Sequence, residues 1–294
     1  ADHVVDEFEA HGFASVLALP LLSPAAATLV ERKLAEITAD SMLFLEDLKA
    51  LTISTPAGSR EFHRTILKET TGPRGFGKLS ISSSDTTKHF SLWRHELAVL
   101  DMPEAVQESI LGLPGHWPKL TRAEISIAVS DDSDPTPGKL SIFLPTSLES
   151  GAALHINAPF FGDMSRTTIS FDTDAEGAQA GGNYNDFLLH QTAVLALDAI
   201  ISDLAGRSAA EAAAILDILA PHAAETRSEE RWQNHLRQAA AEKGVDIETA
   251  PWMLSDRSWC SLSDASLLPV PNDPKLLDAH LLRQNATFPA YVEA

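Results

Sequence analysis

The sequence predicts an α+β protein in which an antiparallel or mixed sheet domain is followed by an α/β unit and a helical C-terminal region. Up to residue 171 the chain consists largely of short strand-like segments separated by turns that contain Gly and Pro. From residue 185 to residue 243, apolar residues recur at helical spacing instead. A group of strands that precedes a group of helices is typical of the α+β class.

Composition limits the classes of protein to which the chain can belong. Its 294 residues suffice for one large or two modest domains, and 44% of them are hydrophobic, as in ordinary globular proteins. No apolar stretch approaches the roughly 18 residues of a membrane-spanning helix, and the short apolar run 16–22 follows acidic residues, unlike a signal peptide. The net charge of −19 would repel phosphate backbones, so we expect no autonomous nucleic-acid binding.

The single cysteine, Cys260, excludes an internal disulfide framework and a structural zinc site made by cysteines. Because no histidine lies near it in the sequence, we expect a small buried hydrophobic residue rather than a nucleophile. These features fit a reducing cytoplasm.

The first third of the chain reads as a strand, a helix and a meander. We expect a strand at 13–22 and then a helix with Ser23 as its cap and Pro24 in its first turn, ending near 42–45. The following strand-like segments predict an antiparallel meander and cover residues 50–54, 61–69, 78–83 and 87–96. Turns are expected at 56–58 and 71–75.

Further strands and then helices follow. A capping-box-like pattern at 101–104 predicts the start of a short helix. Strands are expected at 122–129, 139–144, 154–161 and 167–171, with an acidic turn segment at 130–138 and a Gly-rich loop at 173–184. Helices are expected at 185–204, 209–219 and 229–243, the last ending at Gly244. Core packing is the simplest role for these helices, and a partner-binding face is the alternative.

Several motifs occur in a fixed order along the chain. They are Leu-Pro-Leu closing an aliphatic run at 13–21, Leu-Phe-Leu at 43–45, Phe-Leu-Pro at 143–145, His-Ile-Asn-Ala-Pro-Phe at 155–160, Asn-Asp-Phe-Leu-Leu at 185–189 and Trp-Cys-Ser-Leu-Ser-Asp-Ala at 259–265. In order and spacing they resemble the segment downstream of the ATP-binding domain in sacsin-like members of the Bergerat-type (GHKL) ATPases, relatives of the ninety-kilodalton heat-shock chaperones. The chain departs from the pattern at Ala158, where Gly is usual, and at Tyr184, where Trp is usual.

The resemblance implies four parts. Residues 1–22 would hold the last strand of an upstream ATPase domain, 23–118 a linker helix and β meander, 119–205 a transducer-like α/β unit, and 206–294 a helical region with a mixed C-terminal segment. The chain has no Asp-x-Gly-x-Gly motif and no P-loop, and its Gly-rich segment 71–77 reads as a turn. We therefore expect no cofactor in this chain, and Mg-ATP in the upstream domain.

In this superfamily the transducer presents one cation to the γ-phosphate of ATP. The resemblance implies that Arg166, in the segment 162–166 between two strands, has this role, and a guanidinium suits it because it stays charged and binds phosphate oxygens as a fork. The alternative is that Arg166 pairs with Asp163 or another surface acid. Lys139 is a second candidate, since some relatives use a lysine.

Other polar residues admit two interpretations each. His155 could be a ligand or a base, but strand alternation puts it on one face with Ala153 and Asn157, which favours a hydrogen-bonded structural histidine. The pairs His63-Arg64 and Arg94-His95 lie in expected strands, and solvated faces explain them.

Two functions follow from these features. The first is a middle or transducer module that couples ATP binding and hydrolysis in an upstream domain to conformational change or to partner binding. The second is a chaperone-like interaction platform without a catalytic role. The implied partners are the upstream ATP-binding domain and a protein client, and the resemblance also allows a homodimer formed through the parent protein. An independent hydrolase has no motif behind it.

Overall fold

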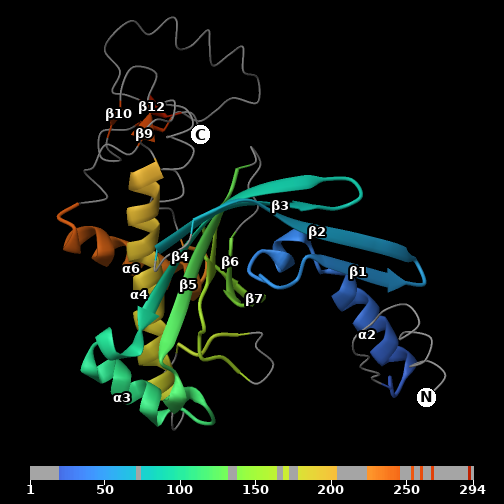
Figure 1. Cartoon of the computed structure of the whole chain (residues 1–294), viewed down its shortest axis with the longest axis horizontal. Coiled ribbons are helices and arrows are strands. Elements are labelled where there is room, and N and C mark those ends of the chain that lie inside the picture. Colours follow the sequence, from blue (N-terminus) through green and yellow to red (C-terminus); the bar gives the residue numbers. More distant parts are fainter. Residues whose placement is uncertain are drawn as a thin grey trace, which may run out of the picture. The chain divides into compact units, whose positions relative to one another are not determined.

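The computed structural model of the chain contains two compact units (Figure 1). One comprises Ala1–Thr38 and Thr52–Arg60, and the other Ala39–Leu51 and Glu61–Ala294. The structure describes residues 20–70, 74–131, 138–163, 168–171, 178–203 and 224–245, together with the short strand pairs near the C-terminus. The elements below lie in these residues.

The described residues form four α-helices and twelve strands. The helices are α2 (Pro24–Ala35), α3 (Glu104–Gly112), α4 (Ala178–Asp203) and α6 (Arg227–Glu242), and the 3-10 turns are η1 (Ala39–Met42), η2 (Val99–Asp101) and η3 (Trp117–Lys119). The strands of the main sheet are β1 (Ala50–Thr55), β2 (Gly58–Glu69), β3 (Arg74–Ser82), β4 (Thr87–Ala98), β5 (Arg122–Ser130), β6 (Lys139–Ile142), β7 (Leu144–Glu149) and β8 (Leu154–Asn157). The short pairs are β9 (Met253–Leu254) with β10 (Trp259–Cys260), and β11 (Ser266–Leu267) with β12 (Tyr291–Val292).

The main sheet has eight strands in the order β1-β2-β3-β4-β5-β8-β6-β7. Strands β2 to β5 pair antiparallel in sequence order, and β8 continues this antiparallel pattern beside β5. Strand β6 is parallel to β8, so the sheet is mixed. The predicted α+β class and the antiparallel meander are therefore confirmed.

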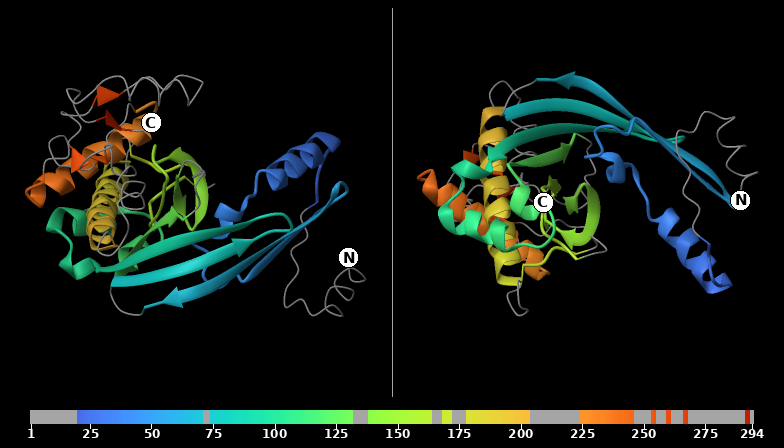
Figure 2. Two further views of the ribbon diagram at one scale, coloured as in Figure 1. Left: turned by 90° about the horizontal axis from the view of Figure 1, so that it is seen from above. Right: turned by 60° about the horizontal axis from the view of Figure 1, so that its bottom comes forward.

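Strand alternation divides the sheet into two faces. Ile125 and Ile127 belong to the main core, in which α4 contacts α3, α6 and strand β5 (Figure 2). Ala128, the residue after Ile127, faces the other side together with Leu92, its partner in the register of β4 and β5. There the turn η1 contacts β3, and the ion pair between Asp40 and Lys88, 3.1 Å long, fastens it to the sheet.

Helix α2 begins as predicted and ends early. The Ser23 hydroxyl accepts a hydrogen bond from the Ala26 N–H at 3.2 Å, and Pro24 is the first helical residue. At the other end the Arg60 guanidinium donates to the carbonyl of Leu34, in the last turn of the helix, at 2.6 Å, and to that of Ile37, two residues beyond the helix, at 3.2 Å. The helix therefore stops at Ala35 rather than near 42–45.

Other boundaries also differ from prediction, and the expected strand 154–161 ends at Asn157. The expected strand 139–144 is split into β6 and β7 at Phe143, a half-exposed residue with φ of 64°, whose N–H donates to the buried Asn157 Oδ1 at 2.8 Å. Of the expected strand 167–171, the described part holds only the bridge between Gly162 and Ile169. The capping box at 101–104 is wrong, because Pro103 is the N-cap and no side chain caps the helix.

Helix α4 shows the largest difference. It starts at Ala178, inside the segment 173–184 that we expected to be a loop. Gly181 contributed to that expectation, but it serves packing, since a Cβ atom there would lie 2.5 Å from the Phe161 ring. Helix α6 confirms its prediction, with a Thr226 cap and Gly244 at φ of 71°. The expected strand residues 13–19 and the expected helix 209–219 lie outside the described residues, and residues 20–22 form no strand.

Arg64 is not on a solvated face, which corrects the sequence interpretation. It is only 7% exposed, because the register with Ile81 turns it toward the face that η1 covers. Its Nη1 donates to the Glu46 carbonyl at 3.4 Å, whereas Nε and Nη2 have no acceptor among the described residues. Burial, together with the nearby Arg94, lowers the pKa of Arg64.

We predict that Arg64→Met leaves the free energy of unfolding unchanged or raises it by up to about 2 kcal/mol, because two buried donors without acceptors disappear. Urea denaturation measures the change. Arg94→Met is the control and should lower stability, since Arg94 pairs with both Glu46, at 2.8 Å, and Glu69, at 3.1 Å. A loss above about 1 kcal/mol in Arg64→Met would contradict the prediction.

We predict that Gly138→Ala lowers the free energy of unfolding by about 1–3 kcal/mol. A Cβ atom on Gly138 would lie 2.0 Å from the Leu154 carbonyl oxygen, so backbone would have to move. Gly112→Ala is the matched control, because its Cβ atom would only touch that of Ala180 at 3.6 Å. Equal stabilities of the two variants in urea denaturation would show that the backbone at Gly138 adjusts without cost.

Candidate functional site

The segment that carries Arg166 has a closed base. Asp163 N–H donates to the Thr168 carbonyl at 3.3 Å, and Ser170 N–H donates to the Phe161 carbonyl at 3.3 Å. Together with the bridge between Gly162 and Ile169, these bonds join residues 161–163 to 168–170, and we call these residues the loop base. Arg166 itself lies outside the described residues, so its role and its pairing with Asp163 stay predictions.

A buried carboxamide from helix α4 holds the loop base. Asn185 Oδ1 accepts the Phe161 N–H, and Asn185 Nδ2 donates to the carbonyls of Phe161 and Ser170, all three at 2.7 Å. The side chain is fully buried, and both N–H groups of its amide are used. One residue of α4 therefore binds the backbone on both sides of the loop.

Aromatic packing fixes the first of these two backbone segments. The Trp117 ring lies edge-on to the rings of Phe161 and Tyr184, with centroids 5.8 Å and 5.6 Å apart. Gly181 allows α4 to approach the Phe161 ring closely, because a Cβ atom at this position would lie 2.5 Å from the ring. The Phe161 backbone is thus held both by hydrogen bonds and by contacts around its ring.

Asp186, the next residue along α4, connects this helix to α6. Its Oδ1 accepts from Arg231 Nη1 at 2.7 Å and lies 3.3 Å from His235 Nε2. Burial alone would raise the pKa of Asp186, but the hydrogen bonds from His235 and Arg231 outweigh it and hold that pKa below its ordinary value. The Arg231 guanidinium also stacks over the Phe171 ring, 4.9 Å from its centroid.

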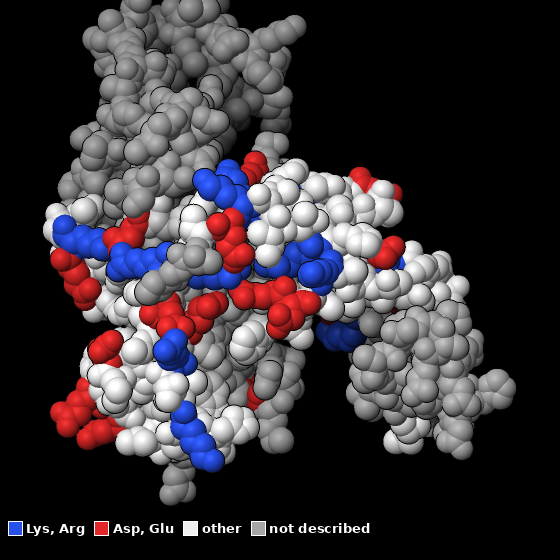
Figure 3. Space-filling model, in the orientation of Figure 1, with Lys and Arg blue, Asp and Glu red and all other residues white. Residues whose placement is uncertain are grey.

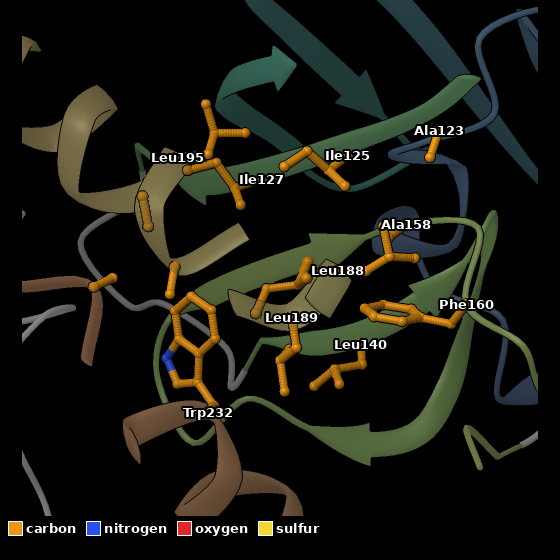
Figure 4. Packing of buried hydrophobic residues seen from close by; sticks show 14 of the residues in the cluster. Ala123, Ile125, Ile127, Leu140, Ala158, Phe160, Leu188, Leu189, Leu195 and Trp232 are labelled. Carbon is orange, nitrogen blue, oxygen red and sulfur yellow. The ribbon is translucent and has the colours of Figure 1, made fainter. Parts of the chain in front are cut away.

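An apolar contact lies beside these polar ones. Trp232 of α6 is 1% exposed and points toward Leu188 and Leu189 of α4 (Figure 4). Phe160, which precedes the loop base, belongs to the same cluster. The loop base, α4 and α6 therefore meet over one part of the main core.

Lys139 and His155, the other candidates, lie elsewhere on the sheet. Lys139 opens β6 and pairs with Glu149 at 3.5 Å. His155 is 3% exposed, and its ring lies edge-on to Phe90. Burial lowers the pKa of His155, Lys88 and Lys139 add to this, and the carboxylate of Asp40 opposes it.

The polar pairs His63-Arg64 and Arg94-His95 differ in exposure and in their ion pairs. His63 is about half exposed and lies 3.2 Å from a Glu61 oxygen, as a solvated face predicts. Arg94 is paired with two glutamates, and burial lowers the pKa of its neighbour His95, with a further contribution from Arg74. On the face drawn in Figure 3, Lys and Arg form a row across the middle, and Asp and Glu lie directly beside it.

The parts of the chain that the structure describes hold no cluster of three or more His, Cys, Asp or Glu residues arranged to bind a metal ion. Nor does any helix in those parts have the length and apolar character to cross a membrane. The backbone of Cys260 forms part of β10, and its side chain lies outside the description.

The hydrogen bonds of Asn185 to the loop base were not predicted; the sequence indicated only a helix start there. A usable signal was present, because Asn185 occupies the apolar stripe of α4, one turn before Leu188 and Leu189. The pairing of Asp186 with Arg231 spans 45 residues, and no local pattern marks it.

Comparison with known proteins returned no match: no protein-family model, no curated protein and no solved structure is similar to this chain.

We predict that stability falls as the pH drops below about 6.5, the ordinary histidine pKa. The unfolded chain then binds a proton more readily than folded His155 does, because burial lowers the pKa of His155, and this costs up to about 1.4 kcal/mol per pH unit. Urea unfolding between pH 5.5 and 7.5 measures this, and His155→Gln should flatten the dependence. The exposed His116→Gln is the control and should not. The pKa of His95 is also lowered, so His95 contributes to the same loss of stability at low pH. The test therefore compares the pH dependence of each variant with that of the parent.

Proposed function

We propose that this chain is the middle or transducer module of a sacsin-like ATPase. It couples ATP binding and hydrolysis in an upstream domain to conformational change or to binding of a protein partner. Arg166 supplies the cation that contacts the γ-phosphate of that domain's Mg-ATP. The partners are the upstream domain and a protein client, and the parent protein is cytoplasmic and able to form a homodimer.

The observation that carries this proposal is the anchored loop base. The four residues 164–167, which include Arg166, connect Asp163 and Thr168, whose backbones are hydrogen-bonded to each other. Strand β8 lies between β5 and β6 in the sheet and helix α4 contacts β5, which supports the proposal of an α/β unit around this base. A cation used in phosphoryl transfer has to be positioned on a rigid support, because catalysis of this kind rests on positioning and electrostatics.

The acidic composition supports an intramolecular partner for Arg166 over a free nucleic acid. The chain has 41 acidic and 22 basic residues. Along the described sheet, arginines such as Arg94 and Arg122 are paired with glutamates. A polyphosphate would therefore approach the chain only where another domain delivers it.

We predict that Arg166→Ala, in the protein that carries both this chain and its ATP-binding domain, lowers kcat for ATP hydrolysis on the order of 10³-fold and leaves the Kd of ATP unchanged. Arg166→Lys should restore part of the rate, since the charge remains. Steady-state hydrolysis and equilibrium ATP binding are the two measurements.

Two matched variants accompany this test. Arg122→Ala removes an exposed arginine that pairs with Glu96, and it should leave kcat unchanged. Lys139→Ala tests the second cation. Full turnover in Arg166→Ala would remove the proposed role, and loss of turnover only in Lys139→Ala would transfer it to the lysine.

A chaperone-like interaction platform is the second candidate, and one observation favours it. Phe143 and Leu144, 51% and 53% exposed, form the tip between β6 and β7, and Phe143 adopts a backbone conformation that bulky residues avoid. Exposed apolar residues on a strained turn are typical of contact surfaces. This function requires that Arg166→Ala leave ATP turnover intact.

A further inference from the structure

The contacts of Arg231 extend from helix α6 to the loop base. Its Nη1 donates to Asp186 of α4 at 2.7 Å, and its guanidinium covers the ring of Phe171, the residue directly after the loop base. Ser170, the preceding residue, is bonded to Asn185 of α4. Asn185 thus contacts Ser170 directly, and Asp186, the next residue of α4, is connected to Phe171 through Arg231.

We propose that Arg231 is a positioning residue that ties the loop base to helix α6, so that the position of the loop and the packing of α6 change together. This inference rests on the proposed function and deepens it, because it names the route by which the loop and the helical region are coupled. In this inference, a displacement of the loop base is transmitted through α4 to α6.

The chemistry of the contacts explains why one arginine suits this place. A planar guanidinium can donate to a carboxylate along its edge while its face rests on an aromatic ring, and a lysine cannot do both. The ion pair alone would be weak, since the side chains of Arg231 and Asp186 are 31% and 37% exposed and partly screened by solvent. The route therefore depends on both contacts of the same guanidinium.

The surroundings make the inference testable without unfolding α6. Trp232, Leu236, Ala239 and Ala240 are all less than 5% exposed and hold α6 against the main core. Removal of the Arg231 head group leaves these four contacts in place. A response at the loop base would then report the lost connection and not the loss of the helix.

The test compares two arginines on the same helix. Arg231→Met removes the guanidinium and keeps an unbranched chain, whereas Arg237→Met removes an exposed one whose hydrogen bonds, to Asn234 and Gln233, stay within α6. Amide hydrogen exchange, followed residue by residue by NMR in the 294-residue chain, reports on the loop base through two amides. These are the N–H groups of Phe161, bonded to Asn185, and Ser170, bonded to Phe161.

We expect both amides to exchange about fivefold faster or more in Arg231→Met, while Arg237→Met stays within twofold of the parent. Asn185→Ala is the positive control, because it removes the acceptor of the Phe161 N–H. Unchanged exchange in Arg231→Met, with faster exchange in Asn185→Ala, would overturn the inference. If the Leu236 amide also exchanges faster, α6 has loosened, and Asp186→Asn, which changes no residue of α6 and removes the charge that Arg231 pairs with, replaces Arg231→Met with the same expectation.

Turnover separates this inference from the proposed function. If both hold, Arg231→Met also lowers kcat in the ATPase-bearing protein and leaves the KM for ATP unchanged. Faster exchange in Arg231→Met together with full turnover in Arg166→Ala would end the proposed function and keep the structural coupling. Unchanged exchange in Arg231→Met together with lost turnover in Arg166→Ala would end the coupling and keep the function.

Discussion

The side-chain amide of Asn185 is the group on which the arrangement of this protein depends most. A buried amide is costly unless its donors and acceptor are satisfied. Asn185 meets that requirement only with the backbone of Phe161 and Ser170. Because Asn185 lies in the otherwise apolar stripe of α4, its amide requires that the backbone of Phe161 and Ser170 lie against this stripe. The backbone at Phe161, after β8, and the backbone at Ser170, at the end of the loop, are fixed together because the Asn185 side chain is hydrogen-bonded to both.

The two faces of the main sheet serve different purposes. One packs against α3, α4 and α6 in a continuous apolar core. The other carries apolar residues under the η1 turn and, farther along, the ion pairs of Arg94 with Glu46 and Glu69. Arg64 lies where these regions meet, buried with two donors that have no described acceptor.

A strained backbone residue follows β6, and a buried polar side chain lies at the end of β8. Phe143 has a left-handed backbone and is held by Asn157, the last residue of β8. Shortly after Asn157, at Phe161, the chain enters the loop base, which is hydrogen-bonded to Asn185. Gly162 belongs to both places, since a Cβ atom there would lie 2.7 Å from the Ile142 side chain. A transducer and an interaction platform would use neighbouring parts of this same edge, and for that reason turnover and not shape distinguishes them.

The sequence by itself determined the α+β class, the meander and the start of α2, because these follow from strand alternation, turn residues and a local cap. The end of α6 at Gly244 was equally local. Only the tertiary structure decided that α4 begins at Ala178, since the reason for Gly181 is the Phe161 ring, 20 residues away in the chain. It also decided the burial of Arg64 and the junction of Asp186 with Arg231. Such contacts join segments that are distant in sequence, and short-range periodicity carries no information about them.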